Sequence, residues 1–125
     1  MRPEKPEEPA DEQDKAVLDI LSRHNGFEHA ISRTTLLNQI RAREFTLNER
    51  MLRRSIYNLR RQGHLICSRS GNDGGYYMAT TYAEYESFRR AEYASKISDM
   101  AETMKIMDAH ADEQFIQVVL QPRLL

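Results

Sequence analysis

The sequence predicts a mainly helical fold with one small β-hairpin, followed by a long helix. Three observations support this prediction. Apolar residues recur at helical spacing in three segments between residues 14 and 62. A glycine-rich run joins two β-compatible segments between residues 64 and 80, and a further helical pattern extends over residues 82–114. The chain of 125 residues shows no internal repeat and suits one compact domain with extensions.

The first 13 residues form an acidic, proline-rich segment that contains three of the four prolines. Such a segment has too little apolar surface to offset the entropy lost on ordering, so we expect it to be disordered. The domain is expected to occupy residues 14–81, and its first helix residues 14–23. Asn25 and Gly26 end this helix, since both residue types tolerate the left-handed conformation of a C-cap.

Two further helices are predicted from their capping residues. Ser32 caps a second helix that runs to residue 41. Thr46 and Glu49 have the spacing of a capping box, with Thr46 as the N-cap of a third helix over residues 47–62. Gly63 ends the third helix.

A hairpin follows, with strands over residues 64–69 and 76–80 and a turn over residues 70–75. Side chains alternate across a strand, so one of Tyr76 and Tyr77 is expected to point inward and the other outward. The apolar positions of all these elements give the expected core: Val17, Ile20, Leu21, Leu36, Ile40, Leu52, Ile56, Leu59, Leu65 and Met78.

Arginines gather on one face of the third predicted helix. Leu52, Ile56 and Leu59 share a narrow sector of the helix and should face the core. The opposite stripe comprises Arg50, Arg54, Tyr57 and Arg61, with Arg53 and Arg60 beside it. Arginine suits planar recognition of phosphates and base edges, so this face favours binding to DNA. A solvated basic face without a partner is the alternative.

Residues 59–81, LRRQGHLICSRSGNDGGYYMATT, resemble the third helix and wing of winged helix–turn–helix proteins, especially small ones from phages and prophages. The resemblance rests on Leu59, Gly63, Leu65-Ile66 and the Gly75-Tyr76-Tyr77 run. It is clearest over residues 46–81, and the order of elements extends it to residues 14–81. It implies that the third helix reads the major groove of DNA and that the hairpin, as a wing, touches the adjacent backbone.

From the helix and the hairpin together we expect a double-stranded DNA-binding protein, specifically a sequence-specific transcriptional regulator of phage or bacterial origin. The alternative is a winged-helix module for protein interaction in a replication or phage assembly complex. The acidic flanks and Asp73 at the hairpin tip leave room for it. The candidate DNA-binding residues are Asn48, Arg50, Arg53, Arg54, Tyr57, Arg61, Arg69 and Asn72.

The helix expected over residues 82–114 carries an apolar series spaced alternately by three and four residues, as in a coiled coil. A homodimer seam is therefore predicted, and a helix folded back on its own domain is the alternative. The spacing of the series fits a parallel and an antiparallel pair equally. Its members are Tyr93, Ile97, Met100, Met104, Met107 and Ala111. Residues 115–125 are expected to form an apolar tail.

Several functions are excluded by what the sequence lacks. Cys67 is the one cysteine, so no disulfide within the chain and no cysteine-rich zinc site is expected. The four histidines show no metal-ligand spacing, and no nucleophile motif, phosphate loop or dinucleotide fingerprint is present. We therefore expect no enzyme activity, no cofactor and no metal. Without an apolar segment long enough for a membrane, a cytoplasmic protein of a bacterial or phage-infected cell is expected.

The charge distribution agrees with a DNA-binding centre. Residues 15–80 have a net charge of +6, whereas residues 1–14 and 81–125 have net charges of −4 and −3. A basic middle between acidic ends points to an anionic partner for the domain and argues against DNA contact by the last helix.

Overall fold

The computed structural model describes residues 5–72 and 74–116. The chain divides into two compact units, Met1–Phe88 and Arg89–Leu125. The first is mainly helical with a two-stranded antiparallel hairpin, and the second is a long helix. This agrees with the coarse fold predicted from the sequence.

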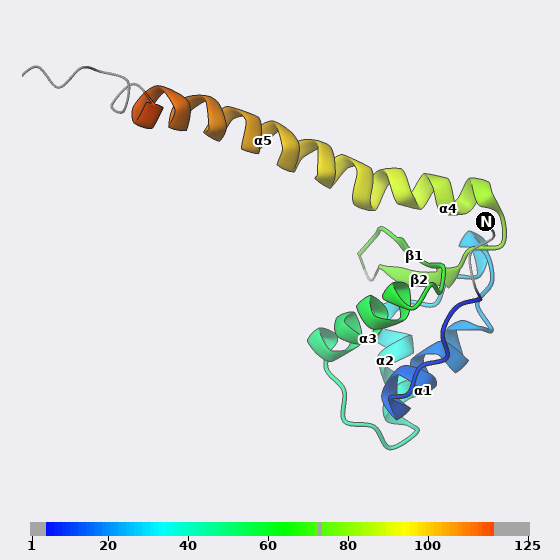
Figure 1. Cartoon of the computed structure of the whole chain (residues 1–125). Coiled ribbons are helices and arrows are strands. Elements are labelled where there is room, and N and C mark those ends of the chain that lie inside the picture. Colours follow the sequence, from blue (N-terminus) through cyan, green and yellow to red (C-terminus); the bar gives the residue numbers. More distant parts are fainter. Residues whose placement is uncertain (1–4, 73, 117–125) are drawn as a thin grey trace, which may run out of the picture. The chain divides into compact units, whose positions relative to one another are not determined.

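Three helices form the body of the first unit: α1 (Glu12–Leu21), α2 (Arg33–Arg41) and α3 (Glu49–Arg61). They lie beside the hairpin (Figure 1), and α1 packs against both α2 and α3. Their apolar faces meet in one core. Its fully buried side chains include Val17, Leu21, Leu36, Ile40, Leu52, Leu59 and Ile66. Because α3 places Leu52, Ile56 and Leu59 in this core, its opposite face is left to solvent.

Two of the predicted helix starts are wrong. Glu12 and Gln13 belong to α1, whose N-cap is Asp11, so the domain begins before residue 14. The α3 helix begins at Glu49, and its N-cap is Asn48, whose side chain accepts a hydrogen bond from the Met51 amide at 2.8 Å. Thr46 is therefore not the N-cap. The predicted Ser32 cap of α2 is confirmed, since its side chain accepts a hydrogen bond from the Thr35 amide.

The segment before α1 lies against the C-terminal end of α3. The Glu7 amide donates a 2.9 Å hydrogen bond to the Gln62 carbonyl, and His64 Nε2 lies 2.8 Å from the Glu7 carbonyl. Gly63 has a φ of +100°, as expected for a residue that ends a helix, and a Cβ there would lie 3.5 Å from the Cα of Pro6. These contacts tie residues 6–7 to the residues that follow α3.

The hairpin consists of β1 (Ile66–Arg69) and β2 (Gly75–Met78), with Cys67 opposite Tyr77 in the register. Both strands are shorter than predicted. Ile31 adds a third, single-residue step to the sheet, because its amide and carbonyl both hydrogen-bond to the backbone of Tyr76. This single bridge anchors the chain just before α2.

Both faces of the hairpin are covered. Tyr76 packs into the main core, whereas Tyr77 lies in a second buried cluster with Cys67 and Phe88. The two tyrosines point to opposite faces of the hairpin, as expected, but the outward-pointing Tyr77 is buried too, because Phe88 and the Phe27 ring, 5.6 Å from that of Tyr77, cover the outer face. Burial raises the pKa of Tyr77 to about 12 and also raises the pKa of the Cys67 thiol.

Two other core assignments change. Leu65 is 49% exposed, so its predicted place in the core is wrong. The reason is strand alternation: Ile66 points into the core, so its neighbour points away. Met78 is partly buried and packs against the edge of the core. The other eight predicted core residues are buried.

Helical structure follows the hairpin. The α4 helix (Tyr82–Arg89) begins in the first unit, and the second unit contains α5 (Ser95–Ala111). Two segments with π-type hydrogen bonds flank α5, η2 (Arg90–Ala94) and η3 (Asp112–Ile116). The predicted long helix is therefore present, but it is interrupted and extends two residues beyond 114. Phe115 and Ile116, expected in the tail, belong to η3, and the rest of the expected tail lies outside the described residues.

A carboxylate joins the start of α4 to the loop after α1. Glu84 accepts hydrogen bonds from the Phe27 amide at 2.8 Å and from the Thr80 amide and hydroxyl at 2.9 and 2.8 Å. Its own amide donates to the Thr81 hydroxyl. Phe27 belongs to η1 (Phe27–His29), a short 3₁₀ helix. These bonds favour the charged carboxylate and lower the pKa of Glu84 from 4.5 to about 2.

We predict that Glu84→Gln lowers the stability of the protein at pH 7. The pKa of Glu84 is lower in the folded state, so its contribution is complete above the unfolded-state pKa of 4.5 and is lost as the pH falls toward about 2. Urea unfolding of the variant and of the parent, followed by circular dichroism between pH 7 and pH 3, measures this. The difference in midpoint should shrink below about pH 4.5.

The control is Glu28→Gln, which removes an exposed carboxylate from the same loop region. Glu28 makes no hydrogen bond or ion pair with any residue that the structure describes. A difference for Glu84→Gln that stays constant from pH 7 to pH 3 would contradict the role assigned to its charge.

Candidate nucleic-acid interface

The exposed face of α3 is a continuous basic surface, here called the arginine stripe. It lies opposite Leu52, Ile56 and Leu59, which are buried. The sequence prediction placed six residues on or beside this face; five of them are exposed, and the sixth, Arg60, is partly buried. The five exposed residues are Arg50, Arg53, Arg54, Tyr57 and Arg61.

Three of these arginines have no acidic partner among the residues that the structure describes. Arg50, Arg53 and Arg54 make no ion pair or side-chain hydrogen bond within residues 5–72 and 74–116. By contrast, Arg23 and Arg43 both pair with Asp19, at 3.3 and 2.7 Å. Guanidinium groups in a row on one helix face repel one another. An anionic partner would relieve this repulsion, so the surface favours binding to an anion.

At the C-terminal end of the stripe, an aromatic ring supports an arginine. The guanidinium carbon of Arg61 lies 6.0 Å from the centre of the Tyr57 ring, which is 60% exposed. This distance is at the outer limit of a cation–π contact. The ring restricts the guanidinium group while leaving its hydrogen-bond donors available.

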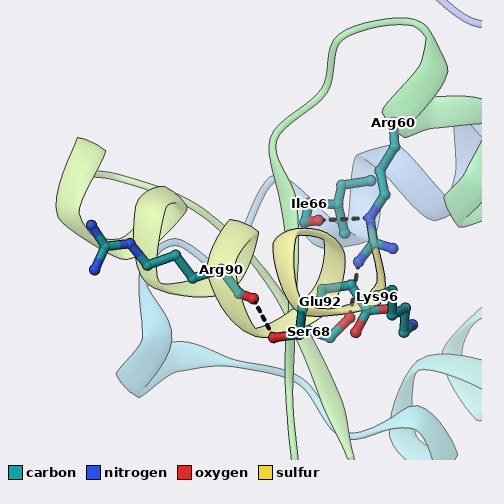
Figure 2. A network of polar contacts seen from close by, with 7 residues as sticks. Arg60, Ile66, Ser68, Arg90, Glu92 and Lys96 are labelled. Carbon is teal, nitrogen blue, oxygen red and sulfur yellow. Dashed lines mark hydrogen bonds and ion pairs between the residues drawn. The ribbon is translucent and has the colours of Figure 1, made fainter. Parts of the chain in front are cut away.

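Arg60, although it neighbours the stripe in sequence, has a structural role. Its Nε donates a 2.8 Å hydrogen bond to the Ile66 carbonyl, and its NH2 group donates a 2.9 Å bond to the Ser68 hydroxyl. Figure 2 shows both bonds. The guanidinium also lies 4.8 Å from the ring centre of Phe88. Arg60 therefore fixes β1 against α3. Its position along the helix puts it next to the stripe, but its side chain is used in packing.

The remaining candidate residues have mixed positions. The Asn48 acceptor oxygen is used to cap α3, which leaves its amide donors for a ligand. Arg69 is partly buried, lies 5.6 Å from the Phe27 ring centre and makes a long 3.5 Å bond to the Phe27 carbonyl. Asn72 is exposed in the hairpin turn. Asp73, which left room for the protein-interaction alternative, lies outside the described residues.

A shallow groove of about 240 Å³ runs beside the hairpin and brings in an arginine that the sequence analysis did not single out. Arg33, the first residue of α2, lies so close to Gly74 that a Cβ there would be 2.8 Å from Arg33 Nε. Gly74 also has a φ of +58°, which favours glycine. The sequence feature that could have identified Arg33 as a candidate is its position directly after Ser32, the N-cap of α2. The lining is Arg33, Ser68, Arg69, Ser70, Gly71, Gly74, Gly75 and Tyr76.

In the second unit, the predicted seam residues are exposed. Ile97, Met100, Met104 and Met107 are between 61% and 71% exposed, and Tyr93 is 43% exposed. Ala111 is partly buried. An exposed apolar series of this regularity on one helix is typical of an interaction surface.

The chain matches no protein-family model, no curated protein and no solved structure at a significant level. In the part of the chain that the structure describes, no helix has the length and apolar content required to cross a membrane. Nor do three His, Cys, Asp or Glu side chains come together there as a metal site would require.

Arg60 and Arg54 are predicted to differ in their effect on stability. Arg60→Ala removes two hydrogen bonds from a charged donor and should lower the free energy of unfolding by about 2 kcal/mol. Arg54→Ala removes an exposed side chain and should change it by less than about 0.5 kcal/mol. Urea unfolding of both variants tests this. Equal losses for the two variants would contradict the division between a structural and a surface arginine.

Proposed function

We propose that the first unit is a winged helix–turn–helix domain that binds double-stranded DNA, with α3 in the major groove. The observation that carries this proposal is the arginine stripe, in which Arg50, Arg53 and Arg54 are exposed and unpaired within residues 5–72 and 74–116. The topology supports it, because a hairpin follows α3 directly and is fixed to it by Arg60.

The stripe has the chemistry that base and phosphate recognition requires. The major groove is about 12 Å wide and admits one α-helix. Arginine can donate two hydrogen bonds to O6 and N7 of guanine, and it also neutralises phosphates. Arg50 and the Asn48 amide lie at the N-terminal end of α3, the end that usually meets base edges in such domains. Arg54, Tyr57 and Arg61 continue the contact along the groove.

The hairpin groove offers a second contact, to the sugar–phosphate backbone. Its hydroxyls and glycine amides are small donors that allow a phosphate to approach closely. Arg33 and Arg69 border the groove and supply positive charge. We assign Arg69, Asn72 and this groove to the wing that contacts phosphates beside the major groove.

We further propose that α5 forms a homodimer through its apolar series. Burying side chains such as Ile97 and Met104 could each contribute about 1.5–3 kcal/mol before the cost of association. A dimer with two-fold symmetry would present two copies of α3 to a pseudo-palindromic site. The protein would then act as a sequence-specific transcriptional regulator.

Arg54→Glu is predicted to weaken DNA binding strongly without unfolding the domain, because it places a carboxylate against phosphates. Fluorescence anisotropy with random and selected duplexes, measured across salt concentrations, tests this. About four to six phosphate contacts per subunit should give a slope of log affinity against log salt of roughly −4 to −5 for the parent. The slope should be less steep for the variant.

The matched control is Lys105→Glu, the same change of charge on the exposed surface of α5. It should leave affinity nearly unchanged. If the parent shows negligible affinity for every duplex at low salt, or if Arg54→Glu binds as well as the parent, the protein-interaction module replaces the DNA-binding proposal.

Met104→Glu is predicted to make the protein monomeric, because a charge in the seam would lose its hydration on burial. The control is Ile106→Glu, which alters another exposed apolar side chain of α5, 52% exposed, on the opposite face of the helix. Light scattering coupled to size exclusion measures the mass. A parent mass of 14.6 kDa at tens of micromolar would contradict the dimer.

A further inference from the structure

The apolar series of α5 also indicates whether two copies of the helix pair parallel or antiparallel. Resting on the proposed homodimer, we infer that the two copies of α5 pair antiparallel, with their midpoint at residue 102. Tyr93 then lies opposite the partner's Ala111. Two independent features favour this arrangement: the sizes of the side chains along the seam and the charges at the two ends of residues 89–116.

The spacing assigns each seam residue a position. Steps from the a to the d position of a heptad are three residues, and steps from d to a are four. Ile97, Met104 and Ala111 therefore occupy a, whereas Tyr93, Met100 and Met107 occupy d. In a parallel pair each residue faces its own copy. In an antiparallel pair each a position faces a d position of the partner.

Side-chain size distinguishes the two arrangements. The parallel pair stacks Tyr93 on the partner's Tyr93 at one end, and at the other end sets Ala111 against the partner's Ala111, which leaves a gap. The antiparallel pair centred on residue 102 sets the largest seam side chain, Tyr93, against the smallest, the partner's Ala111. Large against small fills the seam evenly.

The inner layers of the antiparallel pair are also matched. Ile97 faces the partner's Met107, and Met100 faces the partner's Met104. Each layer then contains at least one methionine, whose flexible side chain adapts to its neighbour. All four of these side chains are more than 60% exposed, so each has surface to bury on pairing.

The charges at the two ends favour the same arrangement. Residues 89–96 contain three basic side chains and one acidic one, a net charge of +2. Residues 108–116 contain Asp108, Asp112 and Glu113 and no lysine or arginine, a net charge of −3. A parallel pair places like charges together at both ends. An antiparallel pair places the positive end beside the negative one and also opposes the helix dipoles.

One ion pair lies within the basic end. Lys96 Nζ lies 2.8 Å from Glu92 Oε1, which neutralises one of the three cations (Figure 2). Arg89 and Arg90 are the other two basic side chains of this end. The charge difference between the ends is therefore carried by groups close to the helix ends, where the two arrangements differ most.

Spin labels at three positions test the direction. Ser95, Glu102 and Ala109 are exposed and lie seven residues apart, on the side of α5 away from the seam. Each is changed to cysteine singly, and label-to-label distances are measured by double electron–electron resonance on the full-length dimer. The parent is the control, since buried Cys67 should take up no label.

An antiparallel pair predicts one short and two long distances. With a rise of 1.5 Å per residue, labels at 95 or at 109 are offset along the axis by about 21 Å, whereas labels at 102 have no offset. A mixture of Ser95→Cys and Ala109→Cys chains should add a short distance that neither variant shows alone.

Each outcome has a separate meaning. Equal distances at all three positions would overturn the antiparallel inference while leaving the homodimer intact. A monomeric mass by light scattering would instead overturn the homodimer itself. A dimer in which labels at 102 lie furthest apart would show that partners pair through another surface, and it would overturn both.

Discussion

The position of the hairpin relative to α3 depends on one guanidinium group. The Arg60 side chain bonds to the Ile66 carbonyl and the Ser68 hydroxyl, and its flat face lies over Phe88. A single residue at the end of α3 is thereby joined to β1 and to α4. Because β2 pairs with β1, and Ile31 pairs with β2, the orientation of the whole sheet edge follows from this anchor. The proposed wing takes its place from Arg60.

The sides of α3 have different roles, and its charged side chains are divided between packing and the exposed surface. Along α3, Leu52, Ile56 and Leu59 face the core, and Ser55 and Asn58 make polar contacts to α1 through Gln13 and Asp14. Arg60 covers the hairpin side. The arginine stripe is what remains after these three sides are occupied. Its lack of acidic neighbours within the described residues is therefore a consequence of how the helix is packed, and this is why it offers the strongest functional argument in the molecule.

Sequence periodicity predicted the helices and most of the core because each local pattern agrees with the fold. Its predictions were wrong where contacts between segments distant in the sequence determine a helix start or the burial of a side chain. Thr46 has the spacing of a capping box, yet Leu47 is buried and its carbonyl accepts a bond from Arg41, so the helix starts later, at Asn48. The outer face of the hairpin is covered by Phe88, which strand alternation at Tyr77 does not reveal. Helical phase alone determines which arginines of α3 are exposed, whereas Arg33 lies at the groove because the Ile31–Tyr76 bridge brings the start of α2 to the hairpin.

Burial makes the thiol of Cys67 unreactive in the folded protein, whereas an exposed thiol would react. The side chain is fully buried beneath Tyr77 and Phe88, and burial raises the pKa of the thiol. Oxidants and electrophiles react with thiols that are both exposed and deprotonated. In the folded state Cys67 is buried and its raised pKa favours the protonated thiol, so neither condition is met. Modification at this position therefore requires the layer between the hairpin and Phe88 to open first. The rate at which a thiol reagent modifies Cys67 would therefore report how often that layer opens.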